Sequence, residues 1–142
     1  MHDIHSPFFH EERHQNLEKI RDAPVTICGV GSLGGPIAET LARMGYTRLT
    51  IIDRDRIEAR NLSCQPYTLA EVGTWKARAL ATSLYRAVKA KVIPIVAEID
   101  EKRSDGLLTG ALLVIDALDN HAGRLAISQS AMARYTMSAC WF

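Results

Sequence analysis

The chain has 142 residues, the length of one domain and too short for two. Its apolar content of 47% and charged content of 23% are ordinary for a soluble globular protein, and no apolar run is long enough to span a membrane. The formal net charge of +1 gives no acidic or basic excess, so the composition does not favour a nucleic-acid or a membrane partner.

The three cysteines, Cys28, Cys64 and Cys140, are odd in number and widely spaced, and they form no Cys-x-x-Cys pair. This pattern argues against a disulfide framework and against a zinc site in the chain. The first residues carry histidine and acidic side chains where a secretory signal has a basic segment followed by an apolar one. We therefore expect a reduced, cytoplasmic protein.

Residues 1–22 are polar and rich in histidine, and we expect them to form a loosely held arm with a short helix. The domain proper is expected to cover residues 23–142. It opens with a compact apolar strand at residues 25–28, which runs directly into a glycine-rich turn. After that turn, apolar residues recur at helical spacing and predict a helix over about residues 33–44.

A second buried strand is predicted at residues 49–52, and residues 54–73 are expected to be irregular. A long helix follows over about residues 75–88. The next apolar run, residues 92–96, contains a proline, which indicates a strand at a sheet edge or at a bulge.

The last part of the chain predicts a fourth strand at residues 112–115 and a helix over about residues 121–133. Residues 137–142 could begin a fifth strand. Because strands alternate with helices, we predict an α/β fold with a Rossmann-like, mostly parallel sheet and helices on both faces. In such sheets ligands bind beyond the carboxyl ends of the strands.

Three glycines, Gly29, Gly31 and Gly34, have the Gly-x-Gly-x-x-Gly spacing of nucleotide-binding turns. The first permits a tight turn, the second lets a phosphate approach the backbone, and the third lets helix and strand pack closely. Amides at the start of the following helix favour an anion. Asp53 ends the next strand, where an acid meets a ribose hydroxyl. This context favours nucleotide binding over glycines that merely ease a turn.

Further polar residues indicate the kind of nucleotide chemistry. Lys76 opens the long helix and is suited to neutralise charge on phosphoryl oxygens. Asp119 follows the fourth strand and is suited to hold Mg²⁺, which uses one or two carboxylates together with phosphates. Asn61 and Gln65 can donate and accept hydrogen bonds without adding charge.

Taken in order, these motifs resemble the ThiF/MoeB/HesA adenylyltransferases, bacterial relatives of the ubiquitin-activating enzymes, over about residues 12–140. The resemblance rests on five segments: Gly29-x-Gly31-x-x-Gly34, Asp53-x-Asp55, Asn61-Leu62-x-x-Gln65, Val72-Gly73-x-x-Lys76 and Asp116-x-x-Asp119-Asn120-x-x-x-Arg124.

The resemblance implies that the chain uses ATP and Mg²⁺. By this resemblance Asp53 meets the ATP ribose, Lys76 contacts phosphate and takes part in catalysis, and Asp119 serves the magnesium ion and the adenylation step. The other nucleotide-binding positions that it implies are Gly29, Gly31, Gly34, Asp55, Asn61, Gln65, Asp116 and Asn120.

The reaction of the family joins AMP to the C-terminal carboxylate of a ubiquitin-like or sulfur-carrier protein that ends in Gly-Gly, and it releases pyrophosphate. The resemblance therefore implies such a carrier as the partner. Family members are commonly homodimers, so it also implies a homodimer. Arg13 is the nearest candidate for an N-terminal arginine that reaches the partner subunit's site.

Two departures from the family pattern stand out. Cys64 occupies a position where the family usually has arginine, so a cation is missing unless Arg56 or Arg60 replaces it from the same loop. The chain also stops where a fifth strand should begin, so we expect the N-terminal portion of a longer protein or a truncated product.

Other interpretations of the same residues stay open. In an NAD-dependent oxidoreductase, Asp53 would hold the NAD ribose, but Lys76 and Asp119 would have no use. A non-catalytic dimerising module that retains the fold is the third alternative. At single positions, Asp119 or Asn120 could simply cap the following helix, and Cys28 could be a small buried hydrophobic residue.

Overall fold

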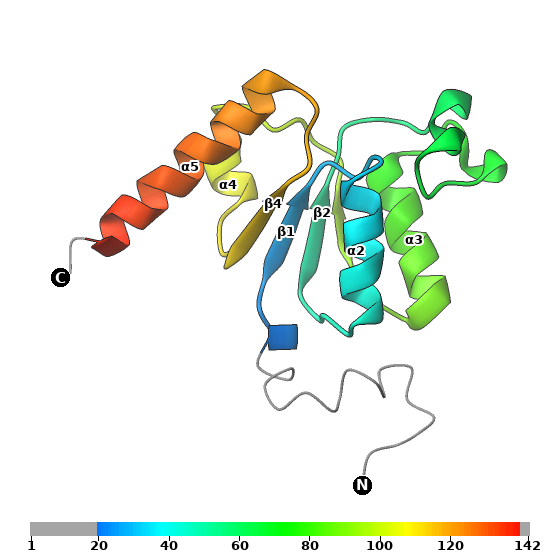
Figure 1. The fold of residues 1–142 in the computed structure, drawn as a ribbon, viewed down its shortest axis with the longest axis horizontal. Coiled ribbons are helices and arrows are strands. Elements are labelled where there is room, and N and C mark those ends of the chain that lie inside the picture. Colours follow the sequence, from blue (N-terminus) through cyan, green and yellow to red (C-terminus); the bar gives the residue numbers. More distant parts are fainter. Residues whose placement is uncertain (1–19, 140–142) are drawn as a thin grey trace, which may run out of the picture.

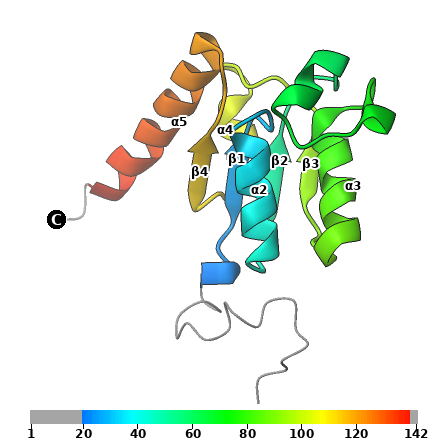
Figure 2. The same cartoon turned by 45° about the vertical axis from the view of Figure 1, so that its right-hand side comes forward.

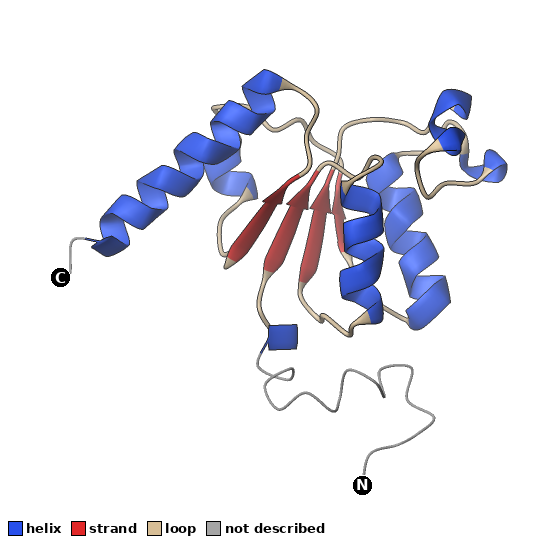
Figure 3. Ribbon diagram, viewed as in Figure 1, coloured by secondary structure: helices blue, strands red, loops and turns tan. Residues whose placement is uncertain are grey.

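The computed structural model describes residues 20–139, with the side chains described as far as residue 133. Four strands form one parallel sheet, as Figures 1 and 3 show: β1 (Val25–Cys28), β2 (Leu49–Ile52), β3 (Ile93–Ile95) and β4 (Leu113–Asp116). Their order across the sheet is β3-β2-β1-β4, so β1 lies between β2 and β4. The chain steps outward from β1 to β3 and then returns to place β4 on the other side of β1. This reversal is the switch point at which open α/β sheets bind ligands.

Helices cover both faces of the sheet, as predicted. Figures 1 and 2 show α2 (Gly34–Arg43) and α3 (Lys76–Val88) on one face, and α4 (Ser104–Leu107) and α5 (His121–Ala139) on the other. Residues of β1 alternate between the two sides, because Ile27 belongs to the core beneath α2 and α3 and Cys28 to the core beneath α4 and α5. The predicted Rossmann-like α/β fold is confirmed.

The burial of each strand follows its place in the sheet. All four residues of β1 are buried, because β1 has a strand on each side and helices on both faces. β3 pairs only with β2, so Pro94 lies on an edge strand, where its missing N–H group leaves no gap in the sheet interior. The proline therefore marks the sheet edge, one of the two positions that the sequence predicted.

The ends of several elements differ from those predicted. The fifth strand expected from residue 137 is wrong for residues 137–139, which continue α5; residues 140–142 lie outside the described range. After Gly123 this helix meets no glycine or proline, so nothing in the sequence stops it. The sequence also gave no indication of α4 or of the two 3₁₀ turns, η2 (Ala59–Ser63) and η3 (Leu69–Glu71), in the segment predicted to be irregular.

The predicted N-terminal arm, residues 1–22, lies almost wholly outside the described residues, so its helix and Arg13 stay predictions. Between residues 20 and 139, no helix combines the length and the apolarity needed to cross a bilayer.

Candidate functional site

A cavity of about 400 Å³ opens at the carboxyl ends of the strands, a volume suited to a small ligand. Its walls are the turn after β1, the segment after β2, the loop after β3 and the loop between β4 and α5. Nine of the eleven predicted site residues line it: Gly29, Gly31, Asp53, Asp55, Gln65, Lys76, Asp116, Asp119 and Asn120. The two that do not are Gly34 and Asn61.

The three glycines of the turn meet different constraints. Gly29 has a φ of +88°, and a Cβ atom there would lie 2.8 Å from the carbonyl oxygen of Ala117. A Cβ atom on Gly34 would lie 1.8 Å from the carbonyl oxygen of Gly29, so only glycine fits where α2 meets β1. At Gly31 the nearest atom is 3.7 Å away, on the Gln65 side chain, and Gly31 lines the cavity. Of the three glycines, Gly31 is therefore the one at which a Cβ atom would meet no close contact and would project toward the cavity.

The start of α2 is open to an anion. Its N-cap residue, Leu33, makes no side-chain capping hydrogen bond, and its first turn carries no acidic residue. Backbone N–H groups at a helix start carry partial positive charge. In α2 the Gly35 amide already donates to the Gly31 carbonyl oxygen and Pro36 has no N–H group, so the amides available to an anion are those of Gly34 and the turn before it. Since Gly31, Ser32 and Leu33 line the cavity, this end of α2 is suited to hold a phosphate group there.

Asp53 and Tyr67 fix the turn from two sides. Asp53 Oδ2 accepts a hydrogen bond from the Val30 N–H group at 2.9 Å, and its Oδ1 accepts one from the Asp55 N–H group at 2.7 Å. The Tyr67 hydroxyl donates to the Val30 carbonyl oxygen at 2.6 Å. Burial raises the pKa of the Asp53 carboxyl above its ordinary value, although these amide hydrogen bonds oppose the shift. Asp53 therefore shapes the turn as well as lining the cavity.

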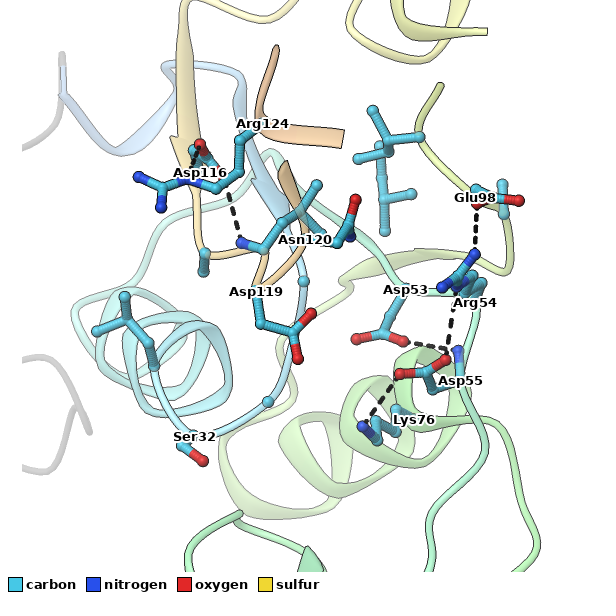
Figure 4. A pocket seen from close by; sticks show the side chains of 18 of the residues that line it. Ser32, Asp53, Arg54, Asp55, Lys76, Glu98, Asp116, Asp119, Asn120 and Arg124 are labelled. Carbon is cyan, nitrogen blue, oxygen red and sulfur yellow. Dashed lines mark hydrogen bonds and ion pairs between the residues drawn. The ribbon is translucent and has the colours of Figure 1, made fainter. Parts of the chain in front are cut away.

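Asp55 lies between two cations. Lys76 is buried, with 7% of its surface exposed, and its Nζ lies 3.5 Å from Asp55 Oδ2. The Arg54 Nε lies 3.7 Å from Asp55 Oδ1, and the other end of Arg54 forms an ion pair with Glu98 from the loop after β3. Figure 4 shows this chain of charged groups along one side of the cavity. Two positive groups therefore line the cavity beside the end of β2.

The loop between β4 and α5 supplies the opposite wall. Asn120 Oδ1 accepts a hydrogen bond from the Gly123 N–H group at 2.7 Å, so Asn120 is the helix cap that the sequence allowed. Asp116 accepts hydrogen bonds from the Leu118 amide at 3.1 Å and from Arg124 Nε at 3.3 Å. The Asp119 carboxylate has no hydrogen bond or ion pair with residues 20–133, whose side chains the structure describes. In Figure 4 it points into the cavity.

The donor set fits a metal ion that shares its coordination with a ligand. Among the described residues, no three histidine, cysteine or acidic side chains are grouped so that they could hold a metal ion. Mg²⁺ commonly takes only one or two carboxylates and completes its coordination with water and substrate phosphates. The unpaired Asp119 carboxylate at the cavity is suited to that arrangement. The described side chains alone do not supply enough ligands to hold the ion without a bound phosphate.

The two arginines that could have replaced the missing one, Arg56 and Arg60, lie away from the cavity. The Arg56 guanidinium stacks 3.8 Å from the centre of the Trp75 ring, and Arg60 pairs with Glu58. Neither lines the cavity, whereas Arg54 and Arg124 do. Asn61 also serves the loop, because its Oδ1 accepts the Glu58 N–H group at 2.8 Å and caps η2. Its predicted contact with a nucleotide has no support in this geometry.

The cysteines have different surroundings. Cys28 is buried, as expected, and burial together with the Asp116 charge raises the pKa of its thiol to about 12, so it is unreactive at neutral pH. Cys64 is exposed, and its sulfur accepts a hydrogen bond from the Ser32 hydroxyl at 3.3 Å. Cys140 lies outside the described residues.

The sequence did not indicate Ser32 or Glu98 as cavity residues, whereas the position of Arg54 just after Asp53 had favoured a phosphate-facing role for at least one charged residue of that loop. Glu98 lies in the loop that follows β3, together with Ala97 and Ile99. The carboxyl ends of parallel strands meet at one edge of the sheet. The position of this loop just after a predicted strand could therefore have indicated that Glu98 lies near the cavity.

The ThiF family model matches residues 3–138, almost the whole length of this chain. The chain belongs to the ThiF family. This confirms the resemblance on which the predicted site residues were aligned.

Individual relatives are longer than this member of the ThiF family. The chain is 28% identical over 129 residues to ubiquitin-like modifier-activating enzyme 5 of Oryza sativa, covering 81% of this chain and 31% of that protein. It is 32% identical over 108 residues to molybdopterin-synthase adenylyltransferase of Salmonella typhimurium, covering 75% of this chain and 43% of the relative. The chain therefore spans less than half the length of these curated relatives.

Solved structures share the fold. The tRNA N6-threonylcarbamoyladenosine dehydratase of E. coli, in complex with ATP, superposes with a TM-score of 0.82 at 25% identity, covering 90% of this chain and 56% of that one. E. coli MccB superposes with a TM-score of 0.68 at 27% identity, covering 73% of this chain and 30% of that chain. The same ThiF fold therefore occurs in a protein that binds ATP.

Proposed function

We propose that this domain binds ATP together with Mg²⁺ and transfers AMP to the C-terminal carboxylate of a ubiquitin-like or sulfur-carrier protein with a Gly-Gly tail. One observation carries the proposal. The open start of α2, the buried Lys76 and the unpaired Asp119 carboxylate all border a single cavity. Relatives named as adenylyltransferases and as modifier-activating enzymes, and a similar structure solved with ATP, support it.

Each part of the cavity suits one part of the nucleotide. The Asp53 carboxylate is held beside the turn and retains lone pairs that can accept the ribose hydroxyls. The amides at the start of α2 receive phosphate oxygens, and the absence of a side chain at Gly31 lets them approach. Lys76 brings a positive charge that is largely shielded from water, so its attraction for a phosphate is screened only weakly.

The proposed reaction joins two substrates. A carboxylate oxygen of the carrier attacks the α-phosphorus of ATP, a new O–P bond forms, and the bond to the bridging oxygen breaks to release pyrophosphate. Lys76 neutralises the negative charge that gathers on the phosphoryl oxygens during this step. Asp55 holds the lysine ammonium group at the cavity wall before ATP binds. Asp119 would hold Mg²⁺, which supplies positive charge to the departing pyrophosphate.

The test follows exchange of labelled pyrophosphate into ATP, using the full chain, Mg²⁺ and a candidate carrier protein that ends in Gly-Gly. The matched control is the same carrier without its last two glycines. We expect exchange with the intact carrier alone. Equal exchange with the shortened carrier, or exchange with neither, would contradict a carrier carboxylate as the acceptor.

Replacing Asp119 with asparagine tests the metal role. Asp119→Asn removes the unpaired charge at the cavity while keeping the shape of the side chain, so we expect exchange to fall by about 10²-fold, with a higher Mg²⁺ concentration needed for half-maximal rate. Glu101→Gln, another exposed acid, is the control and should retain full exchange. An unchanged Mg²⁺ requirement in Asp119→Asn would exclude this residue as the metal ligand.

A carboxylate carried by a tRNA is the second candidate acceptor. The similar structure with ATP is a tRNA threonylcarbamoyladenosine dehydratase, and a dehydratase of the same name from Haemophilus influenzae is 32% identical to this chain over 108 residues. The same exchange assay distinguishes the two acceptors when threonylcarbamoyladenosine-containing tRNA replaces the carrier. Exchange with tRNA alone would favour this second function.

A further inference from the structure

The chain as a whole has a net charge of only +1, but its basic and acidic residues are unevenly distributed along the sequence. Residues 72–97 contain five lysines and arginines and no aspartate or glutamate. Lys76 is buried at the cavity, and the other four basic residues are exposed. These four, Arg78, Arg86, Lys89 and Lys91, are called the basic face below.

The basic face follows α3 on its solvent side. Ala77, Leu80 and Leu84 of this helix are buried in the core. Arg78, Arg86 and Lys89 point away from them, because separations of eight and three residues return to the same side of an α-helix. Figures 1 and 2 show α3 at the outer end of the helix layer, beside α2, with no described helix or strand over its solvent side. At ~1.5 Å per residue, the helix from Arg78 to its C-cap Lys89 spans about 16 Å, and Lys91 follows just beyond its end.

No acidic side chain among residues 20–133 pairs with the basic face. None of its four residues forms an ion pair with a described residue. The Lys89 ammonium group lies 5.0 Å from the centre of the Tyr85 ring. Several exposed arginines elsewhere do have acidic partners: Arg43 pairs with Glu39, Arg60 with Glu58 and Arg103 with Asp100. Arg86 and Lys89 lie at the C-terminal end of α3, where positive charge is favourable to the helix dipole. Arg78 lies in the first turn, where positive charge opposes the dipole, and Lys91 lies beyond the helix, so these two do not serve the stability of α3.

We propose that the basic face binds the sugar–phosphate backbone of a single-stranded RNA. A line of cations matches a line of phosphates. Ser83 and Tyr85 are exposed among the cations, so hydroxyl groups are present for phosphate and 2′-hydroxyl contacts, whereas the Thr82 hydroxyl donates to the Arg78 carbonyl oxygen. The half-exposed Tyr85 ring offers a surface on which a base can stack.

The composition of the face disfavours other partners. A protein partner usually needs an apolar centre with few lysines, and Tyr85 is the one large exposed hydrophobic residue of α3. A second copy of this chain would bring the same positive charges against it, which is repulsive. The face is also separate from the proposed ATP site, since none of its four residues lines the cavity. RNA binding at the basic face therefore does not depend on adenylyl transfer at the cavity.

The test measures binding of the full chain to a fluorescein-labelled uridine oligonucleotide of about 20 nucleotides by fluorescence anisotropy, at several salt concentrations. The test variant carries Arg78→Gln, Arg86→Gln, Lys89→Asn and Lys91→Gln. All four positions are exposed, and asparagine tolerates the left-handed backbone of Lys89. The control variant removes four exposed cations elsewhere: Arg43→Gln, Arg60→Gln, Lys102→Gln and Arg103→Gln.

We expect the wild-type chain to bind with a slope of log affinity against log salt of about −3, since each phosphate contact on a single strand contributes about −0.7. The test variant should bind at least about ten-fold more weakly with a slope near zero, and the control variant should bind like the wild type. A double variant, Arg78→Gln with Arg86→Gln, should lose about half of the slope and guards against misfolding of the larger variant.

Three results would overturn the proposal: no binding by the wild-type chain, an equal loss of affinity in the control variant, or binding of labelled polyglutamate as tight as that of the oligonucleotide. The last result would identify an acidic protein surface as the partner. Pyrophosphate exchange by the test variant should equal that of the wild type, which separates this proposal from the proposed function.

Discussion

Lys76→Met is expected to reduce pyrophosphate exchange by about 10²-fold to 10³-fold while the chain stays folded. The loss in rate follows from the removal of the one buried cation at the cavity. The fold is expected to survive because methionine keeps the apolar stem of the side chain. The remaining partner, Asp55, has 57% of its side chain exposed, so water solvates the carboxylate that loses its lysine.

The matched control for this lysine is Lys102→Met, which removes an exposed lysine outside the cavity. Exchange should be unchanged in that variant, and both variants should melt within a few degrees of the wild type. Full exchange by Lys76→Met would contradict a role for this lysine in adenylyl transfer. A loss of exchange accompanied by unfolding would show a structural role in its place.

Gly34→Ala and Gly31→Ala are expected to fail in different ways. A Cβ atom at Gly34 would lie 1.8 Å from a backbone carbonyl oxygen, which cannot move without separating α2 from β1. We expect a loss of about 3 kcal/mol or more in the free energy of unfolding, and a fall in Tm of about 10 °C or more. A Cβ atom at Gly31 has 3.7 Å of room, so the fold should be kept while phosphate approach to the amides is blocked.

Thermal unfolding and ATP titration of the two variants separate these effects. Gly31→Ala should melt near the wild-type temperature and bind ATP at least about ten-fold more weakly, because its methyl group occupies the open side of the turn. A Gly31→Ala variant with wild-type affinity for ATP would place the phosphates away from this turn. A Gly34→Ala variant as stable as the wild type would contradict the close contact between Gly34 and Gly29.

Much of the site was accessible from sequence because it lies at the ends of predictable strands. A buried strand followed by a spaced glycine turn fixes where Gly29, Gly31 and Gly34 must lie. Asp53 follows directly after a second apolar run, and Asp119 lies three residues beyond the end of a third. Parallel strands bring their carboxyl ends to one edge, so residues distant in sequence lie together. The same periodicity located α2 and α3 within a few residues.

Other features depend on contacts that no local pattern encodes. The pairing of Arg54 with Glu98 joins residues 44 positions apart, and only the order of β2 and β3 in the sheet makes them neighbours. Asn61 carries the right chemistry for a ligand but is used to cap η2. Arg56 stacks on Trp75 through the loop geometry. The sequence shows which charged residues this loop contains. It does not show which of their side chains point into the cavity and which point away from it.

Calorimetric titration of the full chain with adenosine, AMP, ADP and ATP, in Mg²⁺ buffer, tests whether the turn after β1, Lys76 and Asp119 act on one triphosphate. Affinity should rise with each added phosphate and should be highest for ATP, and NAD should bind no more tightly than AMP. Equal affinities for adenosine and ATP, or a preference for NAD, would mean that these groups do not meet a triphosphate.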